Sequence, residues 1–407
     1  MAARPNLLNS AAGRRWLFAL LYLSEGAPIG FVWWAMPTLL RGLGLGLDAI
    51  TTLTAIATLP WVLKFLAAPF IDASLHRGGT VTRWIVSCQL AMAFTLLPLV
   101  LVDWNHQFPL VVILVALHAT FAAVQDVGID TLAIHVVPRN EFGRVNGWMQ
   151  AGMLGGRAGV AAGSALIAAA LGDPRLAVLG LAALILLPVL VLVFAVVEPP
   201  IRGARLQARA VLRAVTSRAG VAGLLVALLI GAGFEFFGVS VGPRLVDLGE
   251  AGGGVAVFFG FIAPAGLATG ALIGGAMTDR FGTLRGTGIS LAVLSLILCW
   301  VALSDWMPAL GGANFVGFGS AYFAIGALTA SSYALFMILS RGEFAATRFS
   351  LFMAATNACE AWAGFVGGMF AGFSYGITLL SLTAVACIAV IPLYVLSRQR
   401  LERITDE

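Results

Sequence analysis

Residues 59–73 read LPWVLKFLAAPFIDA, an apolar run with a lysine near its centre. Lys64 is the only lysine in the 407-residue chain, and it lies in an apolar window, 49–71, that is long enough to cross a membrane as a helix. Hydrophobic residues make up 60% of the chain and charged residues 11%, whereas about a quarter of the residues of a soluble domain are charged. The chain is therefore predicted to be a polytopic membrane protein.

Apolar windows of this length recur along the whole chain. They are continuously apolar and do not alternate, which excludes a membrane β-barrel, since only helices and closed barrels satisfy the backbone in lipid. The sequence predicts an all-α protein with twelve transmembrane helices, at about 16–40, 49–71, 83–102, 109–135, 145–170, 175–196, 219–241, 253–278, 283–303, 313–340, 347–371 and 374–396.

The basic residues of the connections predict the orientation. With the N-terminus inside, 19 of the 24 basic residues fall on the cytoplasmic side and only Arg41, Arg175 and Arg244 on the outer side. Cytoplasmic loops are enriched in positive charge, so we expect both termini in the cytoplasm of a bacterial cell, with the chain in the inner membrane. The net charge of +5 reflects this bias and does not indicate nucleic-acid binding.

Other sequence features argue against further partners. The N-terminal segment has no cleavage pattern after a short apolar region, so the first helix is expected to be uncleaved. The cysteines lie in apolar spans without the spacing of metal ligands, and we expect no metal and no cofactor. These residues are Cys88, Cys299, Cys359 and Cys387.

The chain divides into two halves that resemble each other. An arginine-rich connection, 198–218, follows the sixth span and separates a bundle at 1–197 from a bundle at 219–407. The motif R-x-E-F occurs near the end of span 4, in PRNEFGR (138–144), and near the end of span 10, in SRGEFAATR (340–348). A parallel repeat of this kind is typical of transporters in which two six-helix bundles rock about a central site.

Glycines recur at every fourth residue on several predicted spans. Two such rows are Gly155, Gly159 and Gly163 on span 5 and Gly266, Gly270 and Gly274 on span 8. Rows of small residues let helix backbones approach closely, so we expect tight helix packing along these faces.

Seven charged residues lie inside predicted spans and away from their ends, at a depth where each charge costs at least about 2.5–3.5 kcal/mol. Asp126 and Asp130 are four residues apart on one face of span 4, with His118 on roughly the same side. Five acids face only two bases, so some acids must hold a proton, which suggests proton coupling; a static ion-pair network is the alternative. The seven residues are Glu25, Lys64, Asp126, Asp130, Arg157, Glu235 and Glu360.

The connection between spans 8 and 9, GGAMTDRFGTLRG (274–286), resembles the G-x-x-x-D-R-x-G signature of the major facilitator superfamily. Asp279 and Arg280 occupy its charged positions, and Asp72 remains in the corresponding loop after span 2. We expect these aspartates and arginines to pair at cytoplasmic helix ends and to act as a gate.

Three segments of the first half resemble the AmpG-like transporters, which include muropeptide permeases, acetyl-CoA transporters and siderophore permeases. The segments are LPWVLKFLAAPFIDA (59–73), VQDVGIDTLAIHVVP (124–138) and NGWMQAGMLGGRAGVAAGSAL (146–166). The resemblance implies that Lys64, Asp126, Asp130 and Arg157 form the polar centre of the site. Ala67 departs from it, because the family has a tryptophan there.

These observations predict a transporter and not an enzyme. We expect a proton-coupled permease that imports a bulky periplasmic solute, with a ferric siderophore as the first candidate. Further candidates for contacts with protons or substrate are Glu25, Glu235 and Glu360. Muropeptide import is the alternative, and orientation alone does not distinguish import from export. A polytopic membrane enzyme and a receptor are more distant alternatives, because the connections hold no nucleophile or metal cluster and a receptor would not require buried acids in both halves.

Overall fold

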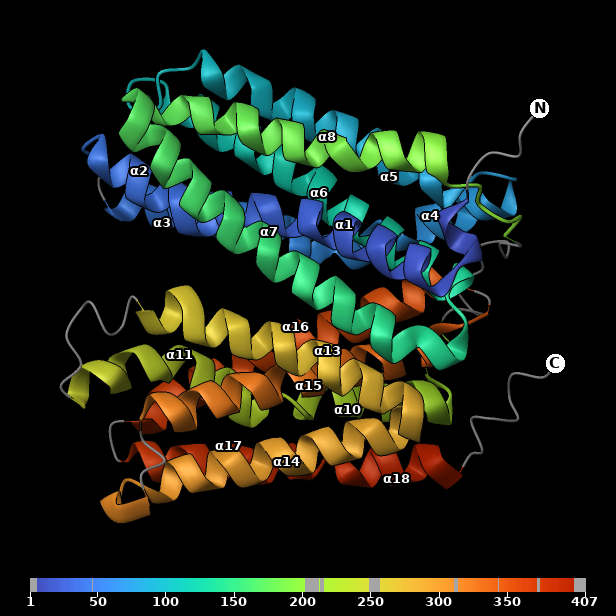
Figure 1. Cartoon of the computed structure of the whole chain (residues 1–407), viewed down its shortest axis with the longest axis vertical. Coiled ribbons are helices and arrows are strands. Elements are labelled where there is room, and N and C mark those ends of the chain that lie inside the picture. Colours follow the sequence, from blue (N-terminus) through green and yellow to red (C-terminus); the bar gives the residue numbers. More distant parts are fainter. Residues whose placement is uncertain are drawn as a thin grey trace. The chain divides into compact units, whose positions relative to one another are not determined.

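The chain folds into helices joined by short connections. The computed structural model describes residues 6–45, 47–201, 212, 216–248, 257–310, 314–342, 344–371 and 374–398, and no strand occurs within these ranges. The chain forms two compact units, each of which has its own packed helices (Figure 1). The prediction of an all-α polytopic protein is confirmed.

Unit 1 comprises Met1–Val137, Trp148–Leu206 and Arg341–Ser350. Its helices are α1 (Ala11–Ile29), α2 (Met36–Gly42), α3 (Leu47–Leu63), α4 (Ala68–His76), α5 (Val81–Leu96), α6 (Phe108–Val136), most of α7 (Phe142–Leu171) and α8 (Ala177–Ala195).

Unit 2 comprises Pro138–Gly147, Gln207–Ser340 and Leu351–Glu407. Its helices are α10 (Arg218–Leu229), α11 (Ala232–Asp247), α13 (Ala263–Phe281), α14 (Thr283–Leu303), α15 (Phe315–Ser340), most of α16 (Ala345–Ala371), α17 (Tyr375–Cys387) and α18 (Val390–Arg398).

Two helices change unit along their length. The first residues of α7 belong to unit 2 and the first residues of α16 belong to unit 1, and both follow an R-x-E-F motif. The division at 1–197, 198–218 and 219–407 remains a prediction, and most of the connection 198–218 lies outside the described residues.

Eleven helical segments in the described part of the chain are long and apolar enough to cross a membrane. The twelfth predicted span, 347–371, corresponds to α16, a helix of 27 residues that carries more polar side chains, among them Thr347, Asn357 and Glu360. The predicted windows thus all coincide with helices, although several spans consist of two helices in succession.

The second span breaks at its lysine. Helix α3 ends at Leu63, a 3₁₀ turn covers Lys64–Leu66, and α4 begins at Ala68. Pro69 accounts for the break, because proline has no N–H to donate to the Phe65 carbonyl and its ring clashes with that carbonyl. The first span also contains a proline, but α1 continues through Pro28 into a π-helical segment, Gly30–Ala35.

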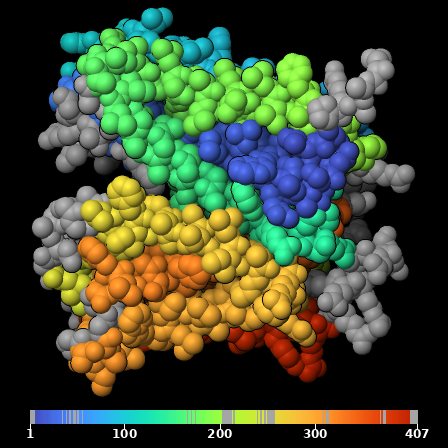
Figure 2. Space-filling view, viewed as in Figure 1, coloured from blue at the N-terminus to red at the C-terminus, as the bar shows by residue number. Residues whose placement is uncertain are grey.

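Helices α1 and α7 pack backbone to backbone in unit 1 (Figure 2). A methyl group on Gly26 would lie 2.1 Å from the Met153 carbonyl oxygen, and one on Gly156 would lie 2.1 Å from that of Leu23. The predicted row at Gly155 and its neighbours does not make this contact, since a methyl group on Gly155 would meet no described atom within 4 Å. The contact falls on the adjacent face of α7.

The glycine row of α13 packs as expected. Helix α13 lies beside α15 in unit 2 (Figure 1), and a methyl group on Gly270 would lie 1.9 Å from the carbonyl oxygen of Phe323. A methyl group on Gly274 would lie 2.4 Å from the Cα atom of Ala327. Close helix packing on this face therefore depends on the absence of side chains.

Candidate functional site

The polar centre of unit 1 is an ion pair between the break in the second span and the long helix α6. The ammonium group of Lys64, in the 3₁₀ turn, contacts the Oδ2 atom of Asp126 in the middle of α6. The side chains are 10% and 5% exposed, so the pair is buried in protein. The break places the lysine side chain toward α6, and its charge is compensated there.

Two more acids join this pair. The Tyr22 hydroxyl of α1 donates to Oδ1 of Asp130 at 2.5 Å, and the buried Glu25 carboxyl acts electrostatically on Asp126. The cluster thus gathers three acids around one amine, so full ionisation of all three acids would leave a net negative charge inside the protein.

Tyr22 was not predicted as a polar partner. It lies one helical turn before Glu25, so the i, i+3 spacing on the first span was the signal that could have identified it. Its hydroxyl links α1 to α6, and its ring is 3% exposed.

Neutral polar residues surround the cluster. Ser24, Gln89 and Gln125 are completely buried, and both glutamine side chains donate to the Ser24 hydroxyl, at 3.2 Å and 3.5 Å. His118 makes a different contact: its Nδ1 atom lies 3.1 Å from the carbonyl oxygen of Met92 in α5.

Arg157 lies on α7 in the same unit. Its backbone packs against Gly30, and its Nη2 atom lies 3.2 Å from the sulfur atom of Met153. The expected role of Arg157 as a partner of the aspartates remains a prediction.

The acids of the second half are placed differently. Glu235, in the first turn of α11, is partly buried and lines a small cavity, whereas Glu360 on α16 is exposed. Neither forms an ion pair with a basic side chain in the described part of the chain. The expected role of both acids remains a prediction.

Asp72 caps the start of a helix that belongs mostly to the other sequence half. Its carboxylate accepts from the backbone N–H groups of Ala346 and Thr347, at 3.3 Å and 3.0 Å, and from the Thr347 hydroxyl at 2.7 Å. These are first-turn groups of α16, whose backbone donors have no partner within the helix.

Asp279 makes the equivalent cap in unit 2. Its carboxylate accepts from the backbone N–H groups of Gly143 at 2.6 Å and Arg144 at 3.0 Å, in the first turn of α7. The same carboxylate forms a long ion pair with Arg144, whose Nε atom lies 3.9 Å from Oδ2. Arg280, the arginine of the signature, lies over the Phe281 ring, with 5.7 Å between the guanidinium carbon and the ring centre.

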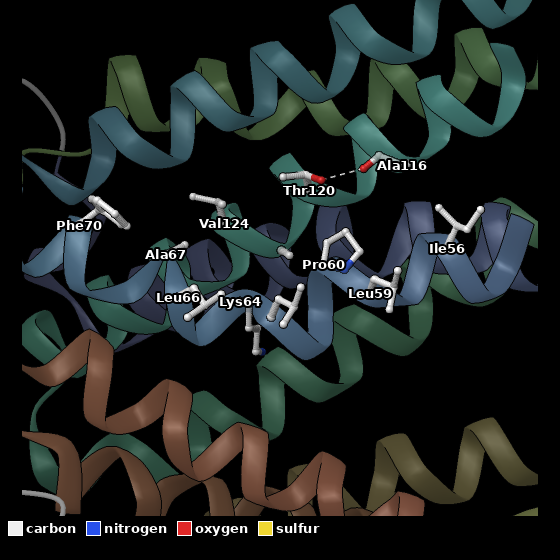
Figure 3. A pocket seen from close by; sticks show the side chains of 12 residues that line it. Ile56, Leu59, Pro60, Lys64, Leu66, Ala67, Phe70, Ala116, Thr120 and Val124 are labelled. Carbon is white, nitrogen blue, oxygen red and sulfur yellow. Dashed lines mark hydrogen bonds between the residues drawn. The ribbon is translucent and has the colours of Figure 1, made fainter. Parts of the chain in front are cut away.

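A groove of about 510 Å³ runs along the outside of this cluster (Figure 3). Its walls are apolar side chains of α3, α4 and α6, with Lys64 as the charged residue among them. In Figure 3 the lysine side chain extends away from Thr120, so the groove is bordered by the aliphatic part of Lys64.

The structure gives no sign of a metal centre built from the usual ligands. Within the described residues, no group of three or more His, Cys, Asp and Glu side chains is arranged to hold a metal ion.

The sequence model of the Major Facilitator Superfamily matches residues 18–368, most of the chain. The chain belongs to the major facilitator superfamily. Membership indicates a multi-pass membrane transporter of small molecules.

Solved structures of this superfamily share the fold. The fucose:proton symporter of E. coli matches with a TM-score of 0.75 at 11% identity, covering 93% of this chain and 97% of that one. A bacterial homologue of the iron transporter ferroportin, in its outward-facing state, matches with a TM-score of 0.72 at 13% identity, covering 94% and 98%. The human organic anion transporter matches with 0.68 at 14%, also covering 94% and 98%.

Proposed function

We propose that this superfamily member is a secondary active transporter of the bacterial inner membrane that uses a proton gradient to import a bulky periplasmic solute. The first candidate for this solute is a ferric siderophore. The observation that carries the proposal is the Lys64–Asp126 pair with Glu25 and the Tyr22–Asp130 contact beside it. Charges buried in a span are costly, so they are usually associated with ion or substrate movement.

The cluster supports coupling through a competition for one amine. When Asp126 binds a proton, its attraction for Lys64 falls, and the ammonium group can then pair with an anionic group of the solute. Loss of the proton restores the internal pair and releases the solute. Asp130, held by the Tyr22 hydroxyl, and Glu25 are the nearby groups that can pass this proton.

The caps at Asp72 and Asp279 support the proposed gate. Each carboxylate holds the first turn of a long helix, and it can leave those amides without breaking a covalent bond. Arg280 remains a candidate for the gate through its position beside Asp279.

Several considerations support a siderophore as solute. The resemblance of the first half to AmpG-like permeases includes a siderophore-importing branch, and a cationic side chain suits the phenolate, catecholate or carboxylate groups of such ligands. Muropeptide import remains the second candidate on the same resemblance.

Uptake by proteoliposomes tests the proposal. Purified protein would be reconstituted, an inward proton gradient imposed, and ⁵⁵Fe-labelled siderophores and a labelled anhydromuropeptide supplied in parallel. We expect accumulation of one siderophore that a protonophore abolishes. Accumulation that persists at full level without the gradient contradicts proton coupling. Accumulation of the muropeptide alone contradicts the siderophore as solute. Transport that occurs only out of the vesicles, under an outward solute gradient, contradicts import.

A further inference from the structure

A small cavity in unit 2 has a wall composed of oxygen acceptors. It encloses about 90 Å³ and lies between the α10–α11 junction, α15 and α16. A water molecule occupies about 30 Å³ in the liquid, so the cavity suits an ion with one or two waters and is far smaller than the pockets of about 300–1,000 Å³ that hold organic ligands. Its lining residues are Ala227, Ile230, Gly231, Phe234, Glu235, Thr329, Ser332, Tyr333, Thr356 and Cys359.

Three hydroxyl groups of this wall already donate their protons to carbonyl oxygens of their own helices. Thr329 donates to Ile325 at 2.9 Å, Ser332 to Thr329 at 3.2 Å, and Thr356 to Met353 at 2.7 Å. A hydroxyl oxygen that has donated its proton keeps lone pairs for another donor or a cation. These three side chains therefore offer the cavity acceptors and no protons.

The wall carries one acidic side chain. Glu235 contributes a carboxyl group, and no lysine or arginine is among the lining residues. Once ionised, this group is a charged acceptor in a partly buried site, and a cation beside it favours the ionised form.

The span is interrupted at the same place. Helix α10 ends at Leu229 and α11 begins at Ala232, so the junction at Ile230 and Gly231 faces the cavity. The carboxyl end of a helix carries a partial negative charge from its last carbonyl groups. In transporters, carbonyls at interrupted helices coordinate Na⁺ or H⁺.

We propose that this cavity is a binding site for one monovalent metal cation, sodium, held by the Glu235 carboxylate, the hydroxyl oxygens of Thr329, Ser332 and Thr356, and the carbonyl end of α10. A single carboxylate favours a monovalent ion, because Ca²⁺ requires six to eight oxygens with more negative charge and Mg²⁺ keeps most of its waters. The site stands independently of the transported solute and of the Lys64 cluster.

Direct binding of ²²Na⁺ to the purified full-length protein tests the site. We expect saturable binding of one ion per chain that excess K⁺ or choline does not displace. Glu235→Gln keeps the shape of the side chain and is expected to lower the affinity at least about tenfold, because ligand charge sets affinity at such sites. Unchanged binding by Glu235→Gln, or equal displacement by K⁺, overturns the proposal.

A matched pair of serine variants separates the site from general packing. Ser332→Ala removes a cavity oxygen, whereas Ser340→Ala removes a buried hydroxyl of the same helix that donates to Phe336 and does not line the cavity. We expect weaker ²²Na⁺ binding only for Ser332→Ala. Equal loss in both variants overturns the assignment of these ligands.

Cys359 provides a reporter that leaves every proposed ligand in place. With Cys88, Cys299 and Cys387 replaced by alanine, Na⁺ is expected to slow alkylation of Cys359 by a small maleimide several-fold relative to choline at equal ionic strength. Protection that is absent, or that appears only as the pH is lowered, assigns the cavity to protons or water and overturns the proposal. Neither experiment uses the transported solute or a proton gradient, so failure here is distinct from failure of the proposed function.

Discussion

The polar centres of the two units differ in how they balance charge. In unit 1 the acids near the middle of the spans have an internal cation, Lys64, and a phenolic donor, Tyr22. In unit 2 the acid of the corresponding region, Glu235, lies among hydroxyl groups without a described basic partner. The comparison teaches that two bundles of one fold can balance buried acids differently: unit 1 holds an internal cation beside its acids, whereas the cation that we propose for unit 2 comes from outside.

Removal of Lys64 is expected to have the largest effect. Lys64→Ala leaves three acids without their cation, and breaking one side of a buried pair costs about 3–5 kcal/mol. We expect solute uptake in proteoliposomes to fall to background. The control is Lys64→Met combined with Asp126→Asn, which removes both charges and should recover thermal stability without recovering uptake. Normal uptake by a stable Lys64→Ala protein contradicts the role proposed for unit 1.

Neutralisation of Asp130 is expected to separate coupling from binding. Asp130→Asn keeps the shape but cannot carry the proton, so accumulation driven by a pH gradient should be lost while exchange of solute across the membrane continues. Tyr22→Phe removes only the hydrogen bond to that carboxylate, which contributes at most about 3 kcal/mol. This variant should therefore reduce the accumulation driven by the pH gradient without abolishing it. Loss of exchange together with accumulation would assign Asp130 to solute binding or to the fold.

The two caps allow a like-for-like comparison between the units. Asp72→Ala and Asp279→Ala each leave first-turn amides without an acceptor, at a cost of about 1 kcal/mol, as for the loss of an N-cap. Hydrogen exchange should increase at Ala346 and Thr347 in the first variant and at Gly143 and Arg144 in the second. Arg280→Ala, which removes a neighbouring charge but no cap, should leave both regions protected.

A smaller effect is expected in the connection between α5 and α6. Backbone N–H groups of His106 and Asn105, together with the His106 ring, lower the pKa of Asp103 to about 2. The folded pKa of Asp103 lies below the ordinary value near 3.9. The stabilisation of this turn by the Asp103 carboxylate is therefore fully present above about pH 4 and is lost as the pH falls toward 2.

Hydrogen exchange at Asn105 and His106, corrected for its intrinsic pH dependence, measures that order. We expect protection to be constant from pH 7 to about pH 4 and to decrease below it. Asp103→Asn should lower protection at every pH. Protection that stays constant down to pH 2 would show that the carboxylate does not hold the turn.

The sequence predicted the spans and the charged residues within them, because the length of an apolar window and a charge inside it can be read directly from the residues. The partner of Lys64 was not determined by spacing, since Asp126 and Asp130 share one face of a helix and only the placement of the broken span selects between them. The exposure of Glu360 likewise depends on how α16 is rotated.

The caps show a different limit. Asp279 was expected to pair with an arginine because side-chain patterns reveal charges, and Arg144 lies at a long ion-pair distance from it. Its hydrogen bonds, however, come from backbone N–H groups, which every residue except proline carries, so the sequence did not reveal them. The break beside Lys64 was within reach of the sequence, since Pro69 follows at the position that removes a helical hydrogen bond.

The solitary lysine also makes the protein its own chemical probe. The Nζ atom of Lys64 is the only lysine amine in the sequence that an amine-reactive ester can acylate. Acylation requires an accessible, unprotonated amine, and the paired, buried ammonium group offers neither. Mass spectrometry of the peptide around residue 64 would therefore record, as a rising fraction of acylated lysine, each condition under which that pair opens.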